Sequence, residues 1–202
     1  MSEAIRFDAD GLVPCVMQDA STGEVLTVAY MNEEALQKTL ETREVHFFSR
    51  SRQELWRKGQ TSGSVMRLRA LRYDCDEDAV LALVSPGGPA CHTGERTCFY
   101  RVLEGESELI PYEVLPGLER TLRARQAERP EGSYTVELLD APDLIGAKVQ
   151  EEAEEVSRAA REESDERVAE EAADVLYHLE VLMLSRGLSL ADALGVLDAR
   201  RR

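Results

Sequence analysis

The sequence lacks long apolar runs and lacks an excess of positive charge. No uninterrupted hydrophobic segment of the 202-residue chain approaches the ~18 residues of a membrane span. The first thirty residues also lack a basic start followed by an apolar stretch, so we expect no secretory signal and a cytoplasmic location. The formal charge of −15 repels a phosphate backbone, which argues against nucleic acid as a partner. Small phosphate ligands remain open, because local cations, backbone N–H groups or a metal can override the overall sign.

Residue types are distributed unevenly along the chain. A hydrophobic content of 43% with 31% charged residues is typical of a globular protein. All four Cys, all four Phe and Trp56 lie in the first half, whereas residues 108–202 are rich in Ala, Leu and Glu and carry −10 of the net charge. A segment rich in Gly, Pro and acids at 104–116 leads toward a helix expected at about Leu115. We therefore predict two domains, 1–107 and 108–202.

The two parts also differ in hydrophobic periodicity. Short apolar or β-branched runs predict strands in the first part, at residues 12–18, 25–30, 45–49, 65–73 and 79–84. One helix is expected at 32–42, capped by Asn32. In the second part, apolar residues recur at helical spacing from Val149 and again from Val168, and Gly187 and Ser189 mark the end of one helix and the start of the last. The first domain is predicted to be α+β and mostly β, and the second an all-α helical bundle.

The four cysteines argue against a disulfide framework in a chain expected in the cytoplasm. Cys15 lies in an apolar run and is interpreted as a small buried hydrophobe. Cys75, Cys91 and Cys98 could offer three thiolates to zinc and leave a fourth position open for water, as in catalytic sites. Their spacing matches neither a CxxC ribbon nor the base deaminase signature. A structural zinc closed by His92 is therefore an equal alternative at this point.

An acidic triplet, Asp74, Asp76 and Asp78, surrounds Cys75. On an extended segment these carboxylates would point to one side and Cys75 to the other. Crowding three like charges is unfavourable unless a cation neutralises them, which favours magnesium. A solvated acidic turn is the alternative.

A second motif, SRSRQELWRKGQTSGS at 49–64, concentrates hydroxyls, glycines and cations in an otherwise acidic protein. Such a loop suits phosphate binding on backbone N–H groups. A surface loop without a ligand is the alternative, since the Walker A order is absent. The candidate substrate-binding residues in it are Ser49, Arg50, Trp56, Lys58, Thr61, Ser62 and Gly63.

Together these motifs resemble phosphoribosyl-AMP cyclohydrolase of histidine biosynthesis. The resemblance rests on DCDxDA, ACHTG, SRSRxxLWxKGxTSG and AYMNxEAL and covers nearly all of residues 7–101. It implies hydrolysis of the N1 to C6 bond of the adenine ring in 1-(5-phosphoribosyl)-AMP, in a homodimer whose metal sites take ligands from both chains. It further implies zinc on Cys75, Cys91 and Cys98, magnesium on Asp74, Asp76 and Asp78, and proton transfer by His92. Ser64 and Arg43 depart from the usual family residues.

The second part carries 11 acids between Glu151 and Asp174. A solvated acidic face is the default interpretation of such a run. At 100° per residue, however, Glu152 and Glu155 flank the apolar stripe of one helix, and Glu171 and Asp174 flank that of the next. Paired stripes would bring four carboxylates to one rim, where a divalent cation is needed to offset their repulsion.

This EExxE…ExxD pattern, with PEGSYT at 130–135 and ADVLYHL at 173–179, resembles phosphoribosyl-ATP pyrophosphohydrolase of the all-α nucleotide pyrophosphohydrolase superfamily. The resemblance covers residues 112–201 and implies cleavage of the α,β-phosphoanhydride of phosphoribosyl-ATP with magnesium. It implies that the metal ligands or the base are among Glu151, Glu152, Glu155, Glu171 and Asp174, with Glu152 and Glu155 as catalytic candidates, and that Lys148 contacts phosphate.

We therefore expect a bifunctional homodimeric hydrolase that uses Zn²⁺ and Mg²⁺ and whose C-terminal domain acts first. One alternative is a housecleaning nucleotide pyrophosphohydrolase with a degenerate N-terminal domain. The other is a non-enzymatic, zinc-stabilised scaffold.

Overall fold

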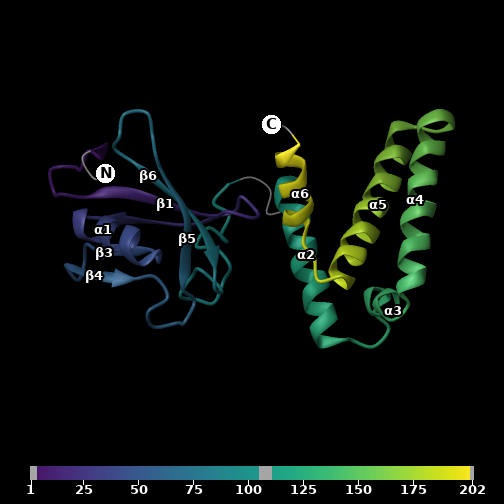
Figure 1. Cartoon of the computed structure of the whole chain (residues 1–202), viewed down its shortest axis with the longest axis horizontal. Helices are drawn as coiled ribbons and strands as arrows, with labels where there is room; N and C mark the ends of the chain where they lie inside the picture. Colours follow the sequence, from purple (N-terminus) through teal and green to yellow (C-terminus); the bar gives the residue numbers. More distant parts are fainter. Residues whose placement is uncertain (1–3, 105–110, 201–202) are drawn as a thin grey trace. The chain divides into compact units, whose positions relative to one another are not determined.

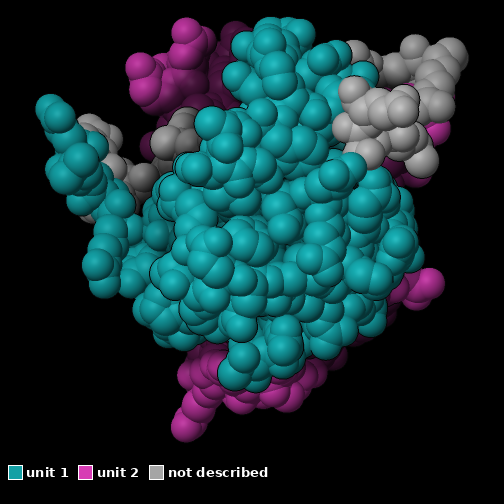
Figure 2. Space-filling view, turned by 90° about the vertical axis from the view of Figure 1, so that its left-hand side faces the viewer, with its two compact units in different colours: residues 1–108 teal, residues 109–202 magenta. Residues whose placement is uncertain are grey.

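The computed structural model describes residues 4–104 and 111–200. The chain forms two compact units, Met1–Glu108 and Leu109–Arg202 (Figure 1), which Figure 2 colours separately. Strands and one helix make up the described part of the first unit, and helices make up that of the second. This confirms the predicted α+β and all-α fold classes. The predicted boundary near residue 107 lies outside the described residues.

The first unit is built on a four-stranded sheet of order β2-β1-β6-β5. Its strands are β1 (Val13–Asp19), β2 (Val25–Met31), β5 (Met66–Tyr73) and β6 (Val80–Pro86). β1 pairs antiparallel with β2 and parallel with β6, and β6 pairs antiparallel with β5. β3 (His46–Ser49) and β4 (Glu54–Arg57) form a separate antiparallel pair. β4 was not predicted from the sequence, because it lies inside the polar 49–64 segment.

Buried and half-buried side chains alternate along β1, and the buried ones form part of the core of this unit. Val13, Cys15 and Met17 are fully buried while the residues between them are half-buried, as expected of a strand with one face on the core. Cys15 is thus confirmed as a small buried hydrophobe, and burial raises the pKa of its thiol to about 12. The aromatic rings of Phe47 and Trp56 lie 5.5 Å apart between paired positions of β3 and β4.

The predicted helix cap at Asn32 is confirmed at the start of α1 (Glu33–Thr42), where its side chain accepts the N–H of Ala35 at 2.8 Å. The helix ends at Arg43, which has a left-handed φ of 59°. Glycine adopts that conformation without strain. The Arg43 guanidinium donates to the backbone carbonyls of Leu68 and Arg69, at 3.3 and 3.2 Å. These contacts offset part of the conformational cost.

The second unit contains five helices in its described residues: α2 (Pro111–Glu128), α3 (Tyr134–Asp140), α4 (Pro142–Glu162), α5 (Asp165–Ser185) and α6 (Leu190–Ala199). α4 and α5 run side by side (Figure 1) and pack along most of their length. Leu122, Leu138, Ile145, Val181 and Leu184 form the buried core.

The helix ends of this unit lie where the sequence predicts them, with one exception. Gly187 adopts φ 71° directly after α5, and Ser189 begins α6 with a capping box to Asp192, which confirms both signals. α2, however, begins at Pro111 and contains Pro116, so the expected start at about Leu115 is wrong. Near the start of a helix, the missing N–H of proline removes at most one intrahelical hydrogen bond. No helix in residues 4–104 or 111–200 combines the length and apolar content of a bilayer crossing.

Candidate active sites

A cavity of about 480 Å³ lies in the first unit and brings distant motifs together. One wall is formed by Cys91, His92 and Cys98, which follow β6 in the chain. Another wall is formed by residues of the 49–64 motif. The full lining is Thr27, Val28, Ala29, Arg52, Glu54, Leu55, Trp56, Arg57, Lys58, Gly59, Gln60, Thr61, Ser62, Ala90, Cys91, His92 and Cys98. Two cysteines, His92 and a basic loop therefore share one cavity.

Cys91 has the surroundings of a thiolate. Its sulfur accepts a hydrogen bond from the Thr93 hydroxyl at 3.1 Å, and this contact, followed by the backbone N–H of Thr93 and by Cys98, lowers the pKa of the Cys91 thiol. The Nδ1 atom of His92 lies 3.9 Å from the same sulfur. Cys75 is exposed in the turn after β5 and does not line this cavity. Among the described residues, one chain therefore offers two of the three predicted zinc thiolates in one place.

The acidic triplet forms a tight turn, so the expected extended geometry is wrong. Residues 74–79 lie between β5 and β6, and Oδ1 of Asp74 accepts the backbone N–H groups of Asp78 and Ala79 at 3.0 and 3.1 Å. These local hydrogen bonds bend the chain. The bend still brings one oxygen each of Asp74, Asp76 and Asp78 within 4.8 Å of one another. Repulsion from Asp76 raises the pKa of the Asp78 carboxyl.

The basic motif places some of its candidate residues in the cavity. Trp56, Lys58, Thr61 and Ser62 line it. Lys58 donates through Nζ to the carbonyl of Ala90 and lies 5.6 Å above the Trp56 ring, so it links the basic loop to the cysteine segment.

Ser49, Arg50 and Gly63 do not line the cavity. The Arg50 guanidinium stacks 3.9 Å from the centre of the Tyr30 ring, and the Ser49 hydroxyl accepts the backbone N–H of Arg52 at 3.3 Å. Gly59 is structurally required, because a Cβ there would lie 2.2 Å from the carbonyl oxygen of Ser64.

The second unit contains a cluster of carboxylates on α4 and α5. One oxygen each of Glu152, Glu155 and Glu171 lies within 4.8 Å of the others. Glu152 and Glu171 are buried, at 7% and 3% exposure, although ionised carboxylates are rarely buried unless paired. The helical spacing predicted four acids at one rim, and three of the four meet here. Asp174 and Glu151 are exposed and lie outside this group.

Basic side chains surround the cluster. Arg167 binds Glu171 and Glu170. Lys148 lies 2.8 Å from Glu151 and 3.7 Å from Glu152, and its contact with Glu151 raises the pKa of the Lys148 ammonium. The cluster is therefore compensated electrostatically by side chains that also suit phosphate binding.

Comparison with known proteins matches the two structural units to two different enzyme families. The family model described as phosphoribosyl-AMP cyclohydrolase matches residues 27–100, and that described as phosphoribosyl-ATP pyrophosphohydrolase matches residues 115–201. The "Histidine biosynthesis bifunctional protein HisIE" of Bacillus subtilis is 50% identical over 98% of this chain and 96% of its own length. The protein of the same name from Thermus thermophilus is 51% identical over 98% of this chain and 93% of its own. The chain belongs to this family of bifunctional histidine biosynthesis proteins.

As a member of the HisIE family, the protein has both activities that the matched models name. The cyclohydrolase match contains Cys75, Cys91, His92 and Cys98, and the pyrophosphohydrolase match contains the α4 and α5 acids. Each candidate cluster therefore lies inside the catalytic domain to which its chemistry was attributed.

In the pyrophosphohydrolase domain, His178 and Tyr134 lie beside the acidic cluster and were not among the residues predicted from the sequence. His178 is buried, its Nδ1 lies 2.9 Å from the carbonyl oxygen of Asp174, and its Nε2 lies 3.2 Å from the Tyr134 hydroxyl. The same Nδ1 is 3.8 Å from Oε1 of Glu152. His178 follows Glu171 by seven residues, and that spacing, which places both on one helical face, could have indicated His178 but not its contact with Tyr134.

Proposed function

We propose that the two domains catalyse consecutive hydrolyses at the two clusters described above. The C-terminal domain converts phosphoribosyl-ATP to phosphoribosyl-AMP and pyrophosphate with Mg²⁺, and the N-terminal domain opens the adenine ring of phosphoribosyl-AMP with Zn²⁺. The observation that carries the proposal is the grouping of residues: Cys91, His92 and Cys98 share a cavity with a basic loop, and three acids meet on α4 and α5.

The N-terminal cavity fits zinc by its donors. Two cysteines lie in one hollow, and the lowered pKa of Cys91 favours the thiolate that binds this metal. When bound, zinc supplies Lewis acidity that lets water attack C6 near neutral pH. His92 is exposed at the cavity wall, where its imidazole can take up and return the proton of that water. Lys58, Thr61 and Ser62 would hold the phosphate.

We further propose a homodimer in which Cys75 from a second copy completes the zinc site. Cys75 is exposed and lies outside the cavity of its own chain, whereas a catalytic zinc takes three protein ligands. Asp74, Asp76 and Asp78 adjoin Cys75, and their crowded oxygens suit Mg²⁺. Both metals would then lie where two copies meet.

The helical cluster fits magnesium, because its donors are carboxylate oxygens only. Glu152, Glu155 and Glu171 would hold the ion, with Glu151 and Asp174 as further candidate ligands on its rim. When bound, the ion neutralises the charge of the triphosphate. Glu152 or Glu155 would accept the proton of the attacking water, and Lys148 would contact phosphate.

The test is to supply phosphoribosyl-ATP and Mg²⁺ and to follow pyrophosphate and the ring-opened product separately. Cys91→Ser should abolish ring opening by removing a zinc thiolate, while pyrophosphate release continues and phosphoribosyl-AMP accumulates. Glu152→Gln should reduce pyrophosphate release while ring opening of added phosphoribosyl-AMP continues.

The alternatives give different results in this assay. A housecleaning pyrophosphohydrolase would release pyrophosphate without ever opening the ring. A zinc-stabilised scaffold would turn over neither substrate. Loss of both activities in a folded Cys91→Ser variant would contradict two separate sites.

A further inference from the structure

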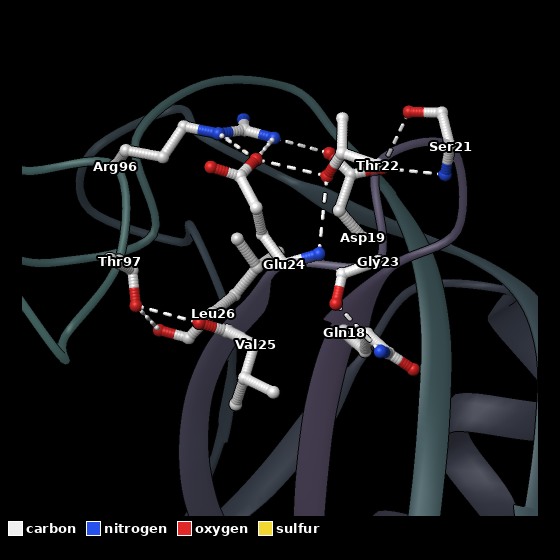
Figure 3. A network of polar contacts seen from close by, with 10 residues as sticks. All are labelled: Gln18, Asp19, Ser21, Thr22, Gly23, Glu24, Val25, Leu26, Arg96 and Thr97. Atoms are coloured by element: carbon white, nitrogen blue, oxygen red, sulfur yellow. Dashed lines mark hydrogen bonds and ion pairs between the residues drawn. The ribbon is translucent and has the colours of Figure 1, made fainter. Parts of the chain in front are cut away.

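In the sequence, Arg96 stands between Cys91 and Cys98, the two cysteines that line the cavity. Its side chain, however, reaches the turn that joins β1 and β2 (Figure 3). Its Nε and Nη2 atoms donate to Oε2 of Glu24 at 3.0 and 2.9 Å, and Nη2 also donates to Oδ2 of Asp19. These partners precede Arg96 by 72 and 77 residues. The contact therefore ties the cysteine segment to a distant part of the fold.

The two carboxylates are buried, with side-chain exposures of 3% for Asp19 and 8% for Glu24. Oδ1 of Asp19 also accepts the backbone N–H and the hydroxyl of Ser21, at 2.8 and 2.6 Å (Figure 3). Burying two neighbouring carboxylates is costly unless a cation joins them, and Arg96 supplies that charge. A buried ion cluster adds little net stability compared with apolar packing of the same volume. Its clearer effect is geometric, because the forked guanidinium fixes both position and direction.

The residues that follow Arg96 also hold the cysteine segment to the rest of the fold through hydrogen bonds. Thr97 donates through Oγ1 to the carbonyl of Leu26 at 3.3 Å, and the Cys98 N–H donates to the same carbonyl at 2.8 Å. On the other side, the carbonyl of Arg96 accepts the N–H of Ala90 at 3.0 Å. Arg96 thus lies where the two ends of the segment come together, next to the point where Thr97 and Cys98 attach to β2.

We propose that Arg96 is a positioning residue for the zinc site. By binding Asp19 and Glu24, it holds the segment so that Cys91 and Cys98 face the cavity at a fixed separation before the metal arrives. The inference rests on the proposed zinc site and adds a residue that does not itself touch the metal. Residues that orient metal ligands typically change metal affinity by about 10-fold to 100-fold. Arg96 should therefore control zinc affinity without affecting the helical site.

The experiment measures metal binding to the full-length protein in four variants. Arg96→Gln removes the charge, and Arg96→Lys keeps the charge but loses the fork. The third variant combines Arg96→Gln with Asp19→Asn and Glu24→Gln, so that no buried carboxylate is left unpaired. Arg69→Gln, an exposed arginine on β5, is the matched control. Zinc dissociation constants come from competition with a chromophoric chelator, Co²⁺ absorption reports the thiolate geometry, and metal-free thermal midpoints report folding.

We expect Arg96→Gln and the triple variant to bind zinc about 10-fold to 100-fold more weakly and to alter the Co²⁺ spectrum. The triple variant should keep its metal-free midpoint, Arg96→Lys should be intermediate, and pyrophosphate release should be unchanged in all. Wild-type zinc affinity and spectrum in every folded variant would overturn the positioning role while leaving the zinc site intact. A wild-type protein that binds neither Zn²⁺ nor Co²⁺ through Cys91 would overturn both proposals.

Discussion

Glu180 on α5 is a carboxyl group whose solvation changes on folding. It is 5% exposed, and neither side-chain oxygen has a hydrogen-bond partner among the described residues. Burial, with a smaller contribution from the charge of Glu119, raises the pKa of Glu180 to about 7. The folded state therefore binds a proton that the unfolded chain has already released at neutral pH. The stability that the folded protein gains by keeping Glu180 protonated is fully present below about pH 4.5. That gain in the free energy of unfolding is lost as pH rises through about 7.

This linkage predicts the pH dependence of Glu180→Gln. At pH 8 the variant should be more stable than wild type, by on the order of 2 kcal/mol, because the amide avoids burying a charge. At pH 5 the two proteins should differ little. Urea unfolding at both pH values, without metal, measures the difference, with Glu128→Gln on an exposed part of α2 as control. A gain that is the same at pH 5 and pH 8 would contradict the raised pKa.

At the scale of elements, the pairing of α4 with α5 turns two acidic helices into one cluster. Neither helix alone would gather Glu152, Glu155 and Glu171, because the first two lie on α4 and the third on α5. Apolar packing between the helices holds the carboxylates together against their repulsion. A bound divalent ion should therefore stabilise the pair, by an amount that grows with its concentration relative to its dissociation constant.

That coupling predicts the behaviour of Glu152→Gln and Glu171→Gln. Both should lower pyrophosphate release by at least about 10-fold and should lose most of the rise in thermal midpoint that Mg²⁺ gives the wild type. Glu162→Gln, which is exposed on the same helix α4, should change neither. Pyrophosphate assays and thermal scans with and without Mg²⁺ provide the measurement. Equal activity in all three variants would exclude a catalytic cluster.

At the scale of the whole molecule, the placement of Cys75 predicts complementation between inactive chains. Cys75→Ser and Cys91→Ser should each abolish ring opening. If each zinc site takes Cys75 from one copy and Cys91 from the other, a mixed dimer contains one intact site. Random reassembly of equal amounts should then restore about a quarter of the wild-type ring opening, because half of the dimers are mixed. No recovery after reassembly would indicate that all three cysteines act within one chain.

The fold classes, most elements and the chemistry of the candidate residues could be predicted from the sequence. Those features depend on near neighbours: the period of two around Cys15, the cap of Asn32, and the spacing that sets Glu152 and Glu155 on one helical face. The family-specific motifs indicated both activities for the same reason, since each motif is a short ordered string.

Which distant groups meet could not be predicted from the sequence, because those contacts depend on the packing of the whole chain. The contact of His178 with Tyr134 and the attachment of Arg96 to Asp19 could not be derived from sequence spacing, because each joins residues far apart in the chain. Arg96 and Asp19 are 77 residues apart, and nothing in the local sequence of either selects the other. The pairing of β1 with β6 sets Asp19 opposite Val84, near the start of the segment that carries Arg96, and only the packing of the complete core fixes that register.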